Sequence, residues 1–222
     1  MDAEAIRIAL PDGMSVSGLW LAPAGATAAL VLAHGAGAGM THRSMAAVAD
    51  GLAERGVATL RYLFPYMEKG GKRVDPPPVA HAAVRAAAAE ARRLAPALPL
   101  FAGGRSFGGR MTSQAQAIEA MPGVRGRVFF AFPLHTAGKP STDRAAHLAD
   151  VQIPMLFLSG TKDTLAELEL LKPVVAGLGA RATLALFAEA DHAFHVPART
   201  GRKDAEVMAE LLDTAAAWMA AH

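Results

Sequence analysis

Short apolar runs alternate with longer stretches of helical periodicity along most of the chain. The apolar runs lie at 29–33, 57–62, 99–102, 127–132, 153–159 and 182–188. Runs of this length are typical of strands that are buried on both faces of a parallel sheet. Helices are predicted at 43–55, 79–95, 107–120, 165–178 and 204–221. The alternation predicts an α/β protein with one mostly parallel sheet and helices on both of its faces.

The first segment of the chain has a different pattern. Residues 5–10 and 14–22 flank Pro11-Asp12-Gly13, and an Asp-Gly pair readily takes the positive φ angles of a tight hairpin turn. We therefore expect an antiparallel hairpin at the start of the sheet. The sequence shows neither a linker nor an internal repeat, and a length of 222 residues suits one large domain. We expect a single domain over 1–222.

Charge and composition narrow the classes of partner. The chain has 22 Lys and Arg against 20 Asp and Glu, a net charge of +2, which is too small for a nucleic-acid-binding surface. Because it has no cysteine, a disulfide scaffold, a thiolate nucleophile and a cysteine-ligated metal are excluded. The first ten residues lack the features of a secretion signal, and no apolar run approaches the ~20 residues of a membrane helix. We expect a soluble cytoplasmic protein with neither a nucleic-acid nor a membrane partner.

One motif suggests a nucleophile. Gly104-Arg105-Ser106-Phe107-Gly108 lies directly after a predicted strand and opens a predicted helix, which is the context of a nucleophile elbow. In such an elbow the serine lies on a strained turn that lifts its Oγ out of the sheet, and the glycines let the neighbouring strand and helix approach. A glycine-rich turn with an incidental serine is the less favoured alternative. We interpret Ser106 as the nucleophile.

A serine nucleophile needs a base that takes its proton and an acid that orients the base. In this kind of fold both follow the serine in the chain, on loops beyond later strands. Asp163 and His192 have these positions, so we expect them at the same carboxyl edge of the sheet as Ser106. Asp163 alone would also suit a helix N-cap, but its place in the order favours the acid. Three alternatives stay open, namely His195 for the base and Glu167 or Glu169 for the acid.

A glycine-rich loop follows the strand at 29–33. Acyl transfer develops negative charge on the substrate carbonyl oxygen, and two backbone N–H groups directed at that oxygen stabilise the transition state. We expect one N–H from Phe107, the residue after the nucleophile, and the other from Ala36 in this loop. A dinucleotide-binding loop is disfavoured because Met40 stands where its third glycine would be needed. His34 is interpreted as a structural residue that braces the loop.

Taken together, these segments resemble the α/β-hydrolase superfamily. The matching segments are His34-Gly35-Ala36-Gly37, Gly104-Arg105-Ser106-Phe107-Gly108-Gly109, Asp163 and Asp191-His192-Ala193-Phe194. A narrower resemblance, to the dienelactone-hydrolase-like bacterial proteins related to animal testis-expressed and histone-acetyltransferase-complex hydrolase-like proteins, rests on the elbow with 64–68 and 132–135. It implies an α/β-hydrolase fold, with Ser106 as nucleophile, Asp163 as acid and His192 as base. True dienelactone hydrolases use a cysteine nucleophile, which this chain lacks.

The leading hypothesis is a serine hydrolase that cleaves a small ester or thioester through an acyl-enzyme, without a cofactor. Two other classes stay open: a non-catalytic interaction module with this fold, and an acyltransferase that uses the same three residues. No metal site is expected, because the His192-x-x-His195 spacing has no third ligand beside it.

The surroundings of the pocket are predicted from position along the chain. Tyr66 and Met67 follow a strand and are expected near the pocket, whereas Arg105 and Arg110 are expected in surface or salt-bridge roles. The interval between the strand after the elbow helix and the strand before Asp163 is too short and too polar to build a cap domain. We therefore expect an open, shallow pocket.

Overall fold

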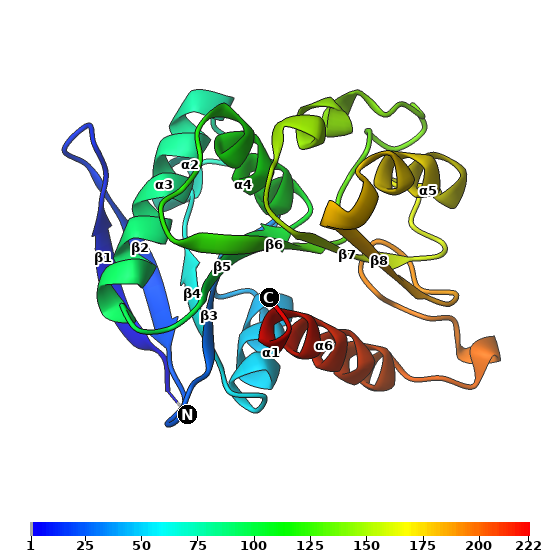
Figure 1. Ribbon diagram of the computed structural model, residues 1–222, viewed down its shortest axis with the longest axis horizontal. Coiled ribbons are helices and arrows are strands. Elements are labelled where there is room, and N and C mark those ends of the chain that lie inside the picture. Colours follow the sequence, from blue (N-terminus) through cyan, green and yellow to red (C-terminus); the bar gives the residue numbers. More distant parts are fainter. Residues whose placement is uncertain (1) are drawn as a thin grey trace.

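The computed structural model describes residues 2–222 and is built on one eight-stranded sheet (Figure 1). The strand order is β1-β2-β4-β3-β5-β6-β7-β8. The strands are β1 (Glu4–Ala9), β2 (Ser15–Leu21), β3 (Ala28–Ala33), β4 (Val57–Tyr62), β5 (Leu100–Arg105), β6 (Val124–Phe130), β7 (Met155–Gly160) and β8 (Ala182–Phe187). The β1–β2 and β2–β4 pairs are antiparallel and all other pairs of this sheet are parallel. The expected mostly parallel sheet with an N-terminal hairpin is confirmed.

Helices cover both faces of the sheet. They are α1 (Arg43–Ala53), α2 (Pro65–Glu68), α3 (Pro77–Leu94), α4 (Phe107–Ile118), α5 (Leu168–Gly177) and α6 (Asp204–Ala220), with 3₁₀ turns η1 (Asp143–Asp150), η2 (Gly179–Arg181) and η3 (Ala198–Thr200). Figure 1 shows α1 and α6 side by side on one face, and α3, α4 and α5 on the other. Since side chains of a strand alternate between faces, a strand such as β3 is buried along its whole length. Its apolar run reflects this burial.

Some local details differ from the sequence-based expectation. In the hairpin turn only Gly13 has a positive φ, of 83°, and Asp12 does not. The Leu10 carbonyl accepts the Gly13 N–H at 3.1 Å and the Leu10 N–H donates to Met14 at 2.8 Å, so the loop has three residues with glycine last. The strand predicted at 127–132 lies at 124–130 instead. It begins earlier because its first residues are not a continuous apolar run, and at its end Ala131 has a φ of 58°, which is outside the β region. The short helices α2 and η1 were not predicted.

The segment between β6 and β7 runs from residue 131 to residue 154 and contains η1. It packs against α4 rather than forming a separate cap over the sheet (Figure 1). The expectation of a fold without a cap domain is confirmed. No helix in the described part of the chain is long and apolar enough to cross a membrane.

The turn from β5 into α4 lies unusually close to the end of β3. A Cβ atom on Gly104 would lie 2.3 Å from the carbonyl oxygen of Ala33, and one on Gly108 would lie 2.5 Å from the carbonyl oxygen of His34. Both obstacles are backbone atoms of a buried strand end, which a side-chain rotation cannot move. Glycine at these two positions therefore lets the turn at Ser106 rest directly on β3.

This close approach predicts a large effect of a single methyl group. Gly108→Ala is expected to lower the free energy of unfolding by about 1–3 kcal/mol or more, because the added Cβ overlaps fixed backbone. Gly177→Ala is the matched control, since an added Cβ there meets no atom within 4 Å and replaces glycine by a better helix former. Urea unfolding of both variants measures the difference, and equal effects would contradict the proposed close contact.

Candidate active site

Ser106 lies on a strained turn between β5 and α4. Its φ is 49° and its ψ is −114°, a conformation that costs a non-glycine residue free energy unless its surroundings hold it. The Ser106 N–H donates to the carbonyl of Phe130 at 3.0 Å, and the Ser106 carbonyl accepts the N–H of Arg110 at 3.1 Å. The first bond ties the turn to β6 and the second begins α4. The serine is therefore fixed from both sides at the carboxyl edge of the sheet.

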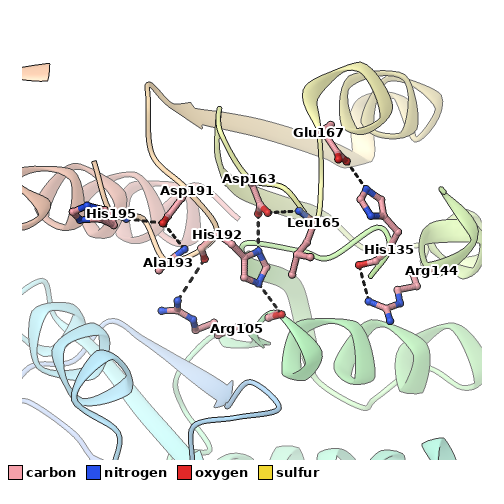
Figure 2. A network of polar contacts seen from close by, with 11 residues as sticks. Arg105, His135, Arg144, Asp163, Leu165, Glu167, Asp191, His192, Ala193 and His195 are labelled. Carbon is pink, nitrogen blue, oxygen red and sulfur yellow. Dashed lines mark hydrogen bonds and ion pairs between the residues drawn. The ribbon is translucent and has the colours of Figure 1, made fainter. Parts of the chain in front are cut away.

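A chain of hydrogen bonds links Ser106 to a histidine and a buried acid (Figure 2). His192 Nε2 lies 2.9 Å from Ser106 Oγ, and His192 Nδ1 lies 2.8 Å from Asp163 Oδ2. An ionised carboxylate only accepts, so the proton of neutral His192 is on Nδ1 and the Nε2 lone pair faces the serine hydroxyl. This arrangement is able to remove the hydroxyl proton when the serine attacks.

Asp163 lies beside His192 and is not the N-cap of a helix, since Glu167 has that position before α5. Its side chain is fully buried. One oxygen bonds to His192, while Oδ1 accepts the N–H of Leu165 at 2.8 Å. The second bond closes a local turn of the kind that aspartate forms before a helix. The turn thus holds the carboxylate in the orientation that the histidine needs.

The three alternative residues lie elsewhere. His195 is exposed, and its Nδ1 pairs with Asp204 at 2.9 Å rather than with the serine. Glu167 bonds to His135 instead of to His192. Glu169 is exposed on α5. The structure therefore brings together Ser106, Asp163 and His192 and leaves the other three apart.

Asp191 holds the loop that carries His192, a role that the sequence analysis did not assign. Its Oδ1 accepts the N–H groups of Ala193 at 2.7 Å and His195 at 2.9 Å, and its own N–H donates to the His195 carbonyl at 3.0 Å. Phe194 is buried against Phe187 with the ring centroids 5.8 Å apart. The Asp191 side chain thus closes the loop around His192, and the Phe194 side chain anchors the loop to the core.

Two backbone N–H groups border the space beside the serine. Ala36 and Phe107 line the same cavity as Ser106. Phe107 is the first residue of α4, and the first N–H groups of a helix have no partner within it. Among residues 2–222 the Ala36 N–H donates to no backbone carbonyl. These two groups are available to a negatively charged oxygen in the cavity.

The glycine-rich loop around Ala36 is braced from behind. His34 is fully buried, with Nδ1–H donating to the Gly35 carbonyl at 2.7 Å and Nε2 accepting the Phe64 N–H at 3.1 Å. Both nitrogens are therefore occupied in the neutral ring, and burial lowers the pKa of His34 further. The Tyr66 hydroxyl donates to the Ala36 carbonyl at 2.8 Å. Burial raises the pKa of Tyr66 to about 12, which keeps this donor protonated.

A cavity of about 330 Å³ lies beside Ser106. Tyr66 and Met67 are not among its lining residues. Tyr66 lies behind the glycine-rich loop, and the sulfur of Met67 lies 2.7 Å from the position that a Cβ of Gly39 would have. One wall comes instead from the segment between β6 and β7, which supplies Pro133, His135, Thr136, Ala137 and Arg144. Sequence reasoning missed this wall, because no periodic pattern encodes the path of a loop.

The arginines of the elbow have other surroundings than expected. Arg105 is partly buried, and its guanidinium donates to the His192 carbonyl at 3.4 Å (Figure 2). Arg110 lines the cavity. Within residues 2–222 neither forms a salt bridge with a carboxylate. The expected salt bridges are therefore not found at either residue, and both side chains are only partly exposed.

Metal-binding side chains do not gather in this part of the structure. Nowhere among the described residues do three or more His, Asp or Glu side chains group in a way that could hold a metal ion. His192 and His195 face different partners.

Comparison with known proteins places the chain in a family. The α/β-hydrolase domain family matches residues 26–220. A dienelactone hydrolase from Anabaena variabilis superposes with a TM-score of 0.81 at 19% identity, over 100% of this chain and 98% of that one. An α/β serine hydrolase without a lid from Xanthomonas campestris gives 0.76 at 22%, over 98% and 95%. An α/β serine hydrolase homologue from Coxiella burnetii gives 0.76 at 20%, over 96% and 98%. The structures share the fold, and because the family match spans most of the sequence, the chain belongs to the α/β-hydrolase family.

Proposed function

We propose that this chain is a serine hydrolase that cleaves small esters or thioesters through an acyl-enzyme. The observation that carries the proposal is the hydrogen-bonded chain from Ser106 through His192 to the buried Asp163, beside a cavity with two available N–H groups. A strained serine, a correctly oriented imidazole and an oxyanion site are the three parts that acyl transfer requires. Their coincidence at one point supports a catalytic role rather than a scaffold role.

The first half-reaction transfers the acyl group to the enzyme. Ser106 Oγ attacks the carbonyl carbon while His192 Nε2 takes the hydroxyl proton, and the N–H groups of Ala36 and Phe107 bind the oxyanion that forms. When the bond between the carbonyl carbon and the leaving oxygen or sulfur breaks, His192 returns the proton to the leaving group. Asp163 holds the imidazole and stabilises its charged form.

The second half-reaction releases the acid. A water molecule attacks the acyl carbon and gives its proton to His192, and the bond to Ser106 Oγ then breaks as the proton returns to the serine. The net reaction consumes one ester and one water and yields one acid and one alcohol or thiol. The ester and the water supply all atoms of the products, so the reaction balances without a cofactor.

Removal of the nucleophile tests the proposal most directly. Ser106→Ala is expected to lower kcat/KM for p-nitrophenyl acetate by more than about 10³-fold, with a melting temperature close to wild type, since one hydroxyl contributes little to packing. A fluorophosphonate probe should label the wild-type chain and not the variant. Activity within tenfold of wild type would exclude Ser106 as the nucleophile, and an unlabelled wild type would favour a non-catalytic module.

The two nearby histidines give a matched pair for the base. His192→Ala is expected to reduce ester turnover by several orders of magnitude, whereas His195→Ala, which removes an exposed ion pair with Asp204, is expected to stay within a few fold of wild type. Steady-state kinetics with one activated ester compares them. The opposite result would move the base to His195 and disprove the loop geometry described above.

The absence of a cap domain predicts that, among neutral esters, those with short acyl chains are preferred. Each methylene that is buried contributes ~0.8 kcal/mol, or about fourfold in affinity, but the cavity beside Ser106 has no apolar cap to bury a long chain. We expect kcat/KM to be highest for acetyl to butyryl esters and to fall for octanoyl and longer. A series of p-nitrophenyl esters with acyl chains of two to twelve carbons measures how kcat/KM depends on chain length. A rise of fourfold or more per carbon pair beyond six carbons would reveal a deep acyl tunnel.

A further inference from the structure

Two guanidinium groups in the wall of the cavity lack an acidic partner. Arg110 and Arg144 both line the cavity beside Ser106. Neither is within salt-bridge distance of any carboxylate in residues 2–222. The carboxylate of Glu167 reaches one lining residue, His135, and bonds to it rather than to either arginine.

The position of Arg110 is electrostatically unfavourable in three ways. It is the fourth residue of α4, and the first turn of this helix contains no acid. A cation near a helix N-terminus is opposed by the helix dipole. Burial, and after it the charge of Arg144, lowers the pKa of the Arg110 guanidinium. Its Nε is also buried without a hydrogen-bond partner among the described residues. An anion in the cavity would offset the costs that arise from charge, namely the helix dipole, the burial of the cation and the repulsion by Arg144.

Arg144 reaches the same cavity from η1. One of its N–H groups donates to the carbonyl of His135 at 2.8 Å (Figure 2). A guanidinium has five donors in a planar fork, so this bond orients the group and leaves other donors for a ligand. Arg110 is oriented in turn by the face of the Phe107 ring, with its Cζ 5.8 Å from the ring centroid. Each guanidinium is thus held in place without being neutralised.

We propose that Arg110 and Arg144 form a subsite for an oxyanion group, such as a carboxylate, that the ester substrate itself carries. The preferred substrate is then an anionic ester, with the charged group within a few atoms of the scissile carbonyl. This inference rests on the proposed hydrolase function, because it places the anion relative to Ser106. The anionic group is part of either the acyl group or the leaving group. The two cases differ in which synthetic ester has the raised kcat/KM.

Matched esters test the proposal. The wild-type chain is assayed with p-nitrophenyl hemiadipate against p-nitrophenyl hexanoate, which differ at the end of a six-carbon acyl chain, and with 4-acetoxybenzoate against phenyl acetate, which differ in the leaving group. After subtraction of the uncatalysed rate, we expect kcat/KM for the anionic ester to exceed that of its neutral partner by about tenfold or more in one pair. The pair that responds identifies the side of the scissile bond that carries the charge.

Variants connect the preference to the two arginines. Arg110→Gln and Arg144→Gln are each expected to reduce the anionic-to-neutral ratio by about tenfold, and Arg110→Lys is expected to retain part of it, because it keeps the charge but not the fork. Arg125→Gln is the control, since Arg125 is exposed near the start of β6, at the other end of the strand from the elbow. Its ratio should equal that of the wild type.

A binding measurement separates this proposal from the proposed function. Ser106→Ala protein is titrated calorimetrically with the same four esters, and the anionic ester of the responding pair should bind about tenfold more tightly than its neutral partner. If neutral esters are hydrolysed through Ser106 but both ratios stay within twofold of one, the subsite is disproved and the hydrolase function stands. If no ester is hydrolysed, the function fails and the calorimetric ratio alone decides the subsite. The subsite is also disproved if the anionic-to-neutral ratio of kcat/KM keeps its wild-type value in both Arg110→Gln and Arg144→Gln.

Discussion

The contact between the β5–α4 turn and the end of β3 is the constraint on which the site depends. A strained backbone conformation such as that of Ser106 costs on the order of 1–3 kcal/mol and persists only where the surrounding structure holds it in place. Here Gly104 and Gly108 bring the turn onto the carbonyls of Ala33 and His34. The same approach sets the first N–H of α4 beside the glycine-rich loop that follows β3. The proposed nucleophile and both proposed oxyanion donors are thus positioned by one backbone contact.

The proposed acid and base are positioned by a second, separate contact between two loops. The N–H of Lys162 donates to the Ala190 carbonyl at 2.9 Å, and the N–H of Glu189 donates to Thr161 Oγ1 at 2.8 Å. These bonds join the loop after β7 to the loop after β8 just before Asp163 and His192 respectively. The carboxylate and the imidazole are therefore held at bonding distance by backbone geometry, and no reorganisation is needed when charge develops on the imidazole.

The sequence predicted the parts of the structure that follow from periodicity or from a local motif. Buried strands such as β3 read as apolar runs, and the strand-to-helix context marked Ser106. The choice between His192 and His195 was not accessible in this way, because it depends on the turn that Asp191 closes. The missing salt bridge of Arg110 could not be predicted for a related reason. Whether a helix-surface arginine meets an acid depends on the path of the segment after β6, which no pattern of apolar positions encodes.

A hydrolase fold without a cap domain has to obtain substrate selectivity from the residues that line its cavity. Burying an acyl chain favours binding only where apolar side chains remove it from water on most sides, and the segment between β6 and β7 is too short to provide this. That segment contributes to the cavity a guanidinium, a histidine and a threonine as well as apolar residues. Charge-assisted hydrogen bonds are stronger than neutral ones and depend on direction, so the proposed arginine subsite would discriminate between ligands without enclosing them. In the proposed subsite, electrostatic recognition takes the place of the apolar enclosure that a cap would supply.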